Sequence, residues 1–136
     1  MFTDNVRDYM RRRKAATYML CESISEYVEK TAKRQARWTD RTAHARQSIN
    51  HDIQMAGDDI TMTVAHGVKY GKYLEEGTPP HEIRLKNKKA FMWNGLPPPI
   101  KKNPIHHPGT KPYNTLKLAA IRGKERLKNS LDRLWR

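Results

Sequence analysis

Cysteine is nearly absent from this chain of 136 residues, in which Cys21 is the only one. A single cysteine excludes both an internal disulfide framework and a zinc site built from several cysteines. Because Cys21 lies within a helical pattern, we expect it to be a small buried apolar residue rather than a reactive thiol.

Long apolar runs are missing too. No stretch approaches the roughly 20 apolar residues that a membrane span needs. The N-terminal region also lacks the apolar centre of a signal peptide, because the basic residues 11–14 stand where it would lie. We therefore expect no membrane partner and a chain that stays in the cytoplasm where it is made.

Acidic residues are scarce relative to basic ones. The chain has 27 Lys and Arg against 14 Asp and Glu, which gives a formal net charge of +13. Such an excess implies a polyanionic neighbour, which is nucleic acid, an acidic protein surface or anionic lipid. The hydrophobic share is 37%, so residues 1–136 fit a single domain with a modest core.

Sequence signatures of catalysis are missing as well. The seven glycines are scattered, and no GxxxxGK phosphate loop is present. The six histidines show neither an HExxH pattern nor Cys/His ligand spacing, and the adjacent His106 and His107 point to opposite sides of an extended chain. We therefore predict no catalytic residues, no metal ligands and no cofactor.

Two long helices are predicted, one within 1–37 and one within 113–136. No proline or glycine interrupts the chain from about Asp4 to Arg37. At 1.5 Å per residue the first helix is about 50 Å long, so part of it is expected to project and meet another subunit. Apolar residues spaced mainly by three or four positions mark both helices: Val6, Met10, Thr17, Leu20, Ile24, Val28 and Thr31 in the first, and Leu116, Ala120, Gly123, Leu127, Leu131 and Leu134 in the second.

Residues 38–93 are predicted to form two hairpins and a short helix. In the first hairpin, a strand ending at Ala56 and an alternating strand over 60–66 flank the turn signal Gly57-Asp58-Asp59.

The second hairpin is predicted to pair residues 81–86 with a return strand over 90–93, through a turn at 87–89. Positive charge lies along it and at its tip. We take four of its basic residues as candidates to face DNA, although lysines also protect an exposed hairpin edge from stray strand pairing. They are Arg84, Lys86, Lys88 and Lys89.

Between the hairpins, the segment 68–80 predicts a surface helix of one or two turns that positions something else. Its apolar residues share one face, and Gly77 and the two prolines that follow Thr78 end the helix. Residues 94–112 are rich in proline and glycine and predict a long loop, ordered or partly mobile; loops of this length are usually either functional or disordered. From these two segments and the return strand over 90–93 we select candidate contacts with other subunits or partners: Tyr70, Tyr73, Leu74, Glu75, Glu76, Trp93, Pro98 and His107.

Taken in order, these segments predict an α+β fold. A long N-terminal helix and a C-terminal helix pack on a small antiparallel sheet of two hairpins, accompanied by a short helix and a long proline-rich loop.

Four segments together resemble a protein family of tailed bacteriophages. Its members are the lambdoid-type tail component or neck proteins, which complete the tail and join the head to the tail. The four segments are WTDRTAHARQSI at 38–49, YGKYLEEGT at 70–78, HEIRLKNKKAF at 81–91 and HPGTKP at 107–112. Their order and spacing are similar to those of the family, and they cover roughly residues 38–120.

Two positions depart from the family's pattern. Ala43 stands where the family usually has glycine, so the sequence gives no reason to assume a positive φ there. Residues 114–116 stand where the family tends to have Phe-Leu.

The resemblance implies a non-enzymatic structural subunit of the virion neck. Such a subunit assembles with copies of itself into a ring between portal and tail. Its neighbours are the portal, adaptor or head-closure proteins on one side and the tail terminator or tube proteins on the other, and genomic DNA passes through the lumen.

Two other functions stay open at this point. The basic composition also fits a small nucleic-acid-binding protein without sequence preference, whose helices contact phosphates. A basic nuclease or toxin-like enzyme is the third hypothesis, with Glu75 and Glu76 joining His66 or His81 around a metal ion. Adjacent glutamates seldom converge on one ion, so we expect this pair to contact Lys or Arg across a subunit interface instead.

Overall fold

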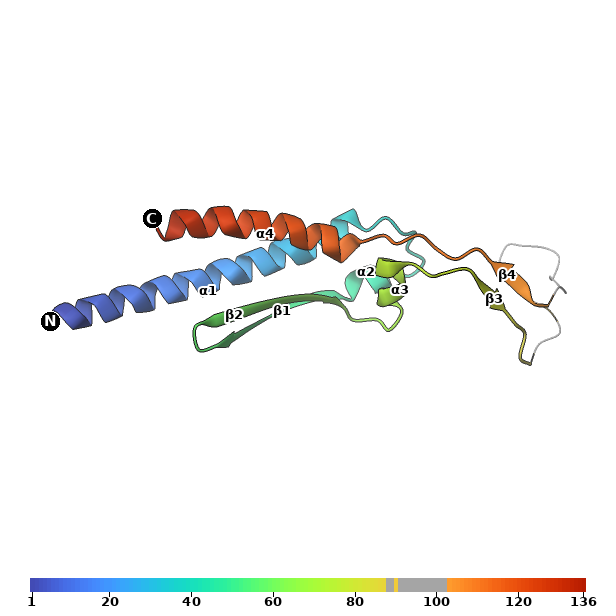
Figure 1. Cartoon of the computed structure of the whole chain (residues 1–136), viewed down its shortest axis with the longest axis horizontal. Coiled ribbons are helices and arrows are strands. Elements are labelled where there is room, and N and C mark those ends of the chain that lie inside the picture. The colour runs from blue at the N-terminus through green and yellow to red at the C-terminus, as the bar shows by residue number, and fades with distance from the viewer. Residues whose placement is uncertain (88–89, 91–102) are drawn as a thin grey trace.

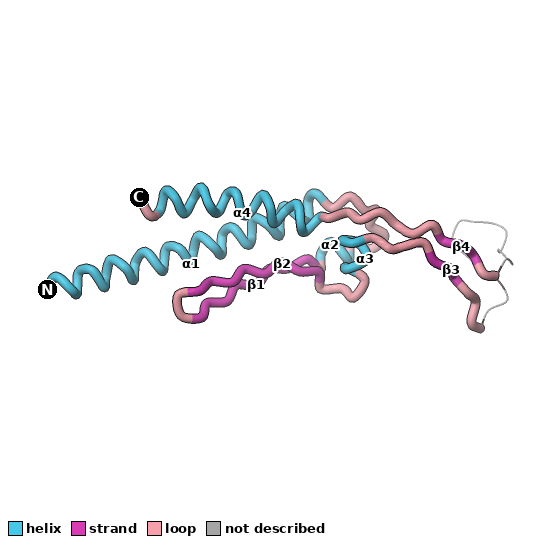
Figure 2. The backbone as a smooth tube through the Cα atoms, in the orientation of Figure 1, coloured by secondary structure: helices cyan, strands magenta, loops and turns pink. Residues whose placement is uncertain are grey.

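The computed structural model describes residues 1–87, 90 and 103–136. Helix α1 (Phe2–Gln35) and helix α4 (Thr115–Leu134) lie side by side, and α1 runs between α4 and the first strand pair in the view of Figure 1. An arm extends away from this body at the end opposite to both termini (Figure 2). The remaining elements are α2 (His44–Gln47), β1 (Ile49–Ala56), β2 (Asp59–His66), α3 (Gly71–Glu76), β3 (His81–Ile83) and β4 (Ile105–His107).

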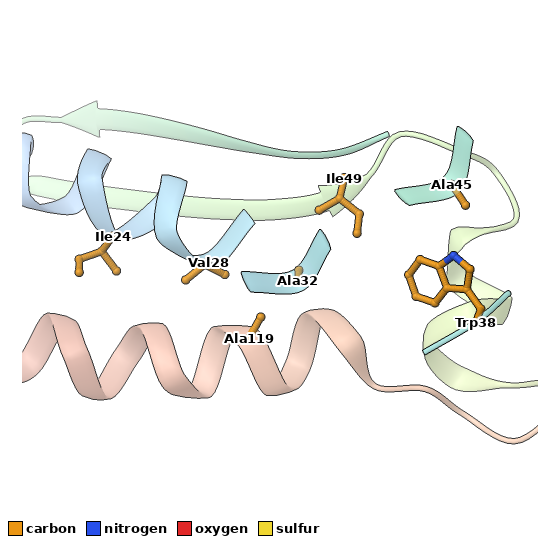
Figure 3. Close-up of a cluster of buried hydrophobic side chains, with 7 residues drawn as sticks. All are labelled: Ile24, Val28, Ala32, Trp38, Ala45, Ile49 and Ala119. Carbon is orange, nitrogen blue, oxygen red and sulfur yellow. The ribbon is translucent and has the colours of Figure 1, made fainter. Parts of the chain in front are cut away.

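Two small residues bring α4 close to α1. Ala119 and Gly123 are both buried and stand four positions apart, hence on one face of α4. A Cβ atom at Gly123 would lie only 2.2 Å from Cγ2 of Val28 on α1. Figure 3 shows Ala119 directed at α1, where Ile24, Val28 and Ala32 form the other side of the contact.

Strands β1 and β2 form the first antiparallel pair, which packs on α1. Their register pairs Ile49 with His66 and Ile53 with Met62, so alternate residues of both strands share one face. Gly57 forms the turn at a φ of 64°. Ile49 is fully buried and joins the main core, whereas the tip of the hairpin is exposed.

A charged network fastens β1 to α1. Glu29 of α1 accepts a hydrogen bond from Lys33 at 2.5 Å and also contacts the ring of His51 on β1. Burial raises the pKa of Glu29, but its hydrogen bonds with Lys33 and His51 outweigh burial and hold the pKa below the ordinary value of 4.5. The ionised carboxylate is therefore the form that the folded chain favours.

The second antiparallel pair is β3 with β4, and it builds the arm. His81 pairs with His107 and Ile83 with Ile105. The predicted return strand over 90–93 was wrong as the partner of β3, because a strand from the proline-rich segment 94–112 takes that place. Residues 91–93 lie outside the described residues. The two strand pairs form separate two-stranded sheets.

The predicted fold class is confirmed: the chain is α+β, with a long helix at each end, a short helix and two antiparallel strand pairs. Cys21 is buried, as expected, and burial raises the pKa of its thiol above the ordinary 9.0. Of the segment 45–56, in which the sequence suggested the first strand, only residues 49–56 form β1, because residues 44–47 form α2. None of the described helices combines the length and the apolar character needed to cross a membrane.

We predict that Gly123→Ala destabilises the protein although alanine is the better helix former. The helix gains about 1 kcal/mol, but the added methyl group meets the stiff, buried Val28 side chain, and such overpacking costs about 1–3 kcal/mol. Chemical denaturation measures the net loss. The double variant Gly123→Ala/Val28→Ala should show a favourable coupling energy. Asn129→Ala, on the exposed face of α4, is the control. A Gly123→Ala protein as stable as wild type would contradict this view of the helix contact.

Candidate assembly surfaces

The C-terminal end of α1 is held by Arg46, which follows in the next segment of the chain. Its guanidinium donates hydrogen bonds to the carbonyl oxygens of Lys33 and Ala36, the latter at 3.2 Å, and pairs with Asp40 at 2.5 Å. Trp38 donates its indole N–H to the same Asp40 carboxylate at 3.0 Å. The last carbonyls of a helix lack partners within the helix, so this arginine supplies what α1 needs in order to end here.

The N-terminal end of α4 is held by Glu75 of α3. Both carboxylate oxygens accept the backbone N–H of Leu116, at 3.0 and 3.1 Å. Nε2 of the buried His66 lies 3.2 Å from the same carboxylate. A negative charge at a helix N-terminus satisfies a free N–H group and the helix dipole together.

Two glycines allow the arm to leave the body. Gly77 and Gly109 have φ angles of 73° and 84°. A Cβ atom at Gly77 would lie 2.3 Å from the carbonyl oxygen of Thr110, and one at Gly109 would lie 2.2 Å from that of Thr78. The two threonines exchange backbone hydrogen bonds at 3.0 Å, so both chains of the arm start from one tight bridge.

The residues that make these contacts lie in three of the four segments that carry the phage resemblance, namely 38–49, 70–78 and 107–112. Trp38, Asp40 and Arg46 end α1, Glu75 starts α4, and the glycine–threonine pairs form the base of the arm. The segments therefore meet in one junction, which orients both long helices and the arm. The surfaces that this junction leaves exposed are the candidates for assembly.

The candidate residues of α3 divide into two groups. Tyr70 and Tyr73 are 46% and 59% exposed and remain available to a partner, and Glu76 is exposed beside Lys72. Leu74 packs against the core of its own chain. The structure also places Glu75 inside its own chain, where it caps α4 and contacts His66. This corrects the prediction that Glu75 pairs with a cation of another subunit.

The candidate residues of the arm are described only in part. His107 stacks against His81 across the strand pair, with ring centres 4.9 Å apart, and its Nδ1 accepts the N–H of Gly109 at 3.0 Å. Arg84 is exposed and bonds Glu82 at 2.8 Å, and Lys86 is exposed. Four further candidates, Trp93, Pro98, Lys88 and Lys89, lie outside the described residues.

The first turns of α1 project beyond the rest of the body, as the helix length predicted (Figure 1). The end of α4 reaches α1 at Thr17, which accepts the indole N–H of Trp135 at 3.2 Å. The hairpin tip reaches it at Lys14, which pairs with Asp58. Before these positions the apolar face of α1 is exposed in the part of the chain that the structure describes, apart from Arg13, which stacks on the ring of Tyr9 at 5.1 Å. We call this exposed face the N-terminal stripe; it consists of Phe2, Val6, Tyr9 and Met10.

An apolar groove of about 410 Å³ lies between α4, β2 and the middle of α1. Val28 of α1 is part of it, and Lys117 and Lys124 are its basic members. The apolar spacing of α4 marked one face of the helix, and the leucines of that face are only half-buried. Because Ala119 and Gly123 approach α1 closely, Leu116 and Leu127 are turned toward this groove. Ala119 and Gly123, two small residues four positions apart, were the sequence signal that could have located the groove. The other lining residues are Met62, Val64, Leu116, Ala120, Gly123 and Leu127.

Nothing in the described part of the chain brings three or more His, Cys, Asp or Glu side chains close enough to hold a metal ion. Of the hypothetical nuclease cluster, Glu75 and His66 lie together, and both carboxylate oxygens of Glu75 also accept the N–H of Leu116. Comparisons with family models, with curated proteins and with solved structures find no match to this chain.

Ala43 has a φ of 58° in the left-handed region, which the departure from the family's glycine gave no reason to expect. That conformation costs an ordinary residue about 1–2 kcal/mol. Ala43→Gly should therefore raise the free energy of unfolding by up to about 1 kcal/mol, after the gain in freedom of the unfolded chain is subtracted. Urea denaturation measures the change, and a less stable variant would contradict the observed backbone.

Glu75→Gln should lower the free energy of unfolding by about 1–2 kcal/mol, because the charge that caps α4 is removed while the side chain keeps its size. Glu76→Gln is the matched control. Its carboxylate is exposed and lies 3.8 Å from Lys72, so its removal should change stability by less than about 0.5 kcal/mol. Equal effects in the two variants would show that the carboxylate of Glu75 does not act as a cap.

Proposed function

We propose that this protein is a non-enzymatic structural subunit of a bacteriophage neck, which assembles into a ring that joins the head to the tail. Besides the resemblance of four segments, one observation on the fold carries this proposal. The N-terminal stripe exposes large apolar side chains on a helix that projects from the described body.

The stripe supports assembly because its continuation along α1 is a packing surface. From Leu20 to Thr31 the same helix face packs within the body. At the N-terminal end Phe2 is 81% and Val6 46% exposed. Contiguous exposed apolar surface on a small protein commonly marks an interaction site. We infer that a neighbouring subunit covers the stripe.

The arm supports a second kind of contact. It extends from the end of the body opposite to the N-terminal stripe (Figure 1). Two unlike contact surfaces at opposite ends of one subunit suit a repeating heterologous contact, which forms a closed ring when the rotation between subunits closes. On this proposal the arm contacts a ring neighbour or the portal-side or tail-side protein, and the particle is the virion.

The net charge favours a second candidate function, which is nucleic-acid binding without sequence preference. Helix α4 alone carries six Lys or Arg residues and two acidic residues, hence a formal charge of +4. In a neck ring, charge of this kind lets phosphates pass through the lumen. In the alternative, DNA binding is itself the function and falls steeply with salt.

Electron microscopy of particles made without this protein tests the proposed function. We expect filled heads and separate tails, and joined particles after purified protein is added. Joined particles formed in its absence would contradict a neck role.

Val6→Asp should prevent this rescue and shift the purified protein, or its complex with a preassembled partner, toward monomer. A carboxylate in the middle of the stripe would be buried without a partner, and each 1.4 kcal/mol of such cost weakens assembly about tenfold. The helix itself tolerates the change, since acidic residues are favourable near a helix N-terminus. Thermal unfolding measures whether the variant is still folded, and mass photometry measures whether it still assembles.

Lys30→Gln is the control, because it changes the net charge by the same one unit at an exposed position of α1 that lies outside the stripe. It should join heads to tails as wild type does. A Val6→Asp protein that folds and assembles normally would exclude the stripe as a subunit contact.

A further inference from the structure

A small polar pocket of about 320 Å³ lies where α1 ends and α4 begins. Three of its residues, Thr115, Leu118 and Arg122, are spaced by three, four and seven positions and so share one face of α4. The remaining lining residues are Gln35 and Arg37, at the end of α1, and Tyr113.

The pocket concentrates positive charge that the protein does not use for its own structure. It is lined by two arginines and no acidic residue. Arg46 and Arg84 have carboxylate partners. Within residues 1–87, 90 and 103–136, by contrast, neither Arg37 nor Arg122 makes a side-chain hydrogen bond or an ion pair.

A buried hydroxyl group gives a second, independent observation. Thr115 is 4% exposed and lines the pocket, and its Oγ1 has no hydrogen-bond partner among the residues that the structure describes. A buried polar atom without a partner is costly unless a ligand or water satisfies it.

We infer that this pocket binds a phosphate group of a nucleic-acid backbone. Guanidinium groups match the oxygen geometry of phosphate and bind it with paired hydrogen bonds. The amide of Gln35 is a further donor, and Tyr113 and Leu118 offer an apolar wall to the adjoining sugar or base. The site lies on the body of the protein, away from the arm, whose basic residues are the candidates to face DNA that the sequence alone suggests.

The inferred phosphate site does not require that the protein assembles into a neck ring. A local site of this kind would serve a neck subunit in contact with the genome as well as a separate nucleic-acid-binding protein. Free phosphate presents the same oxygens as a backbone phosphate, so the experiment must separate these two sources.

Fluorescence anisotropy with a short labelled DNA duplex, measured over a series of salt concentrations, tests the site. The double variant Arg37→Ala/Arg122→Ala is compared with Arg12→Ala/Arg133→Ala, which removes the same charge from exposed positions outside the pocket. The pocket variant should bind at least tenfold more weakly than the control variant. The slope of the logarithm of its binding constant against the logarithm of salt concentration should be shallower than that of the wild type by about 0.9, because one phosphate fewer is neutralised.

Two further measurements distinguish the possible outcomes. Arg37→Lys/Arg122→Lys keeps the charge but removes the paired donors, so it should recover only part of the affinity. Stabilisation of the wild type by inorganic phosphate, absent in the pocket variant and without any duplex binding, would assign the site to free phosphate.

An equal weakening of duplex binding in the pocket and control variants would overturn the inference, as would a wild type that binds neither duplex nor phosphate. Circular dichroism confirms that each variant is folded. Joining of heads to tails is scored separately, so that failure of the pocket and failure of the neck function are distinguishable.

Discussion

The arrangement of this protein depends on one contact: the carboxylate of Glu75, on α3, accepts the backbone N–H of Leu116 in the first turn of α4. It ties α3 to the start of the C-terminal helix and contacts His66 at the end of β2. Arg46 does the equivalent work at the end of α1, with a positive charge on free carbonyl groups. A chain with few buried apolar residues can thus place two long helices through charged groups at their ends, where the backbone has unpaired donors and acceptors.

One consequence of this arrangement is that rigid elements extend beyond a small core. The core lies where α1, α4 and the first strand pair overlap (Figure 3). The first turns of α1 and the arm lie outside it, at opposite ends. Their apolar and basic surfaces are not required by the fold of the monomer. This division into a packed centre and exposed ends is the observation from which we proposed an assembling subunit.

The phage resemblance acquires a physical meaning from the same junction. Residues such as Trp38, Gly77 and Thr110 lie where helix ends and arm strands must meet at fixed angles. The segments that carry the resemblance therefore lie largely at the joint that sets the shape of the chain. The N-terminal stripe, the groove and the arm lie outside this joint.

Local patterns in the sequence determined both long helices, the turn at Gly57 and the short α3, because helix period, strand alternation and turn residues act over a few neighbouring positions. They also determined the excess of positive charge. The partner of β3, the inward direction of Glu75 and the groove beside α4 were decided only by the tertiary structure. Each requires contact between residues distant in sequence, as Glu75 and Leu116 are by 41 positions. Local preference cannot specify such pairs, since the free energy that selects them appears only when the helices pack.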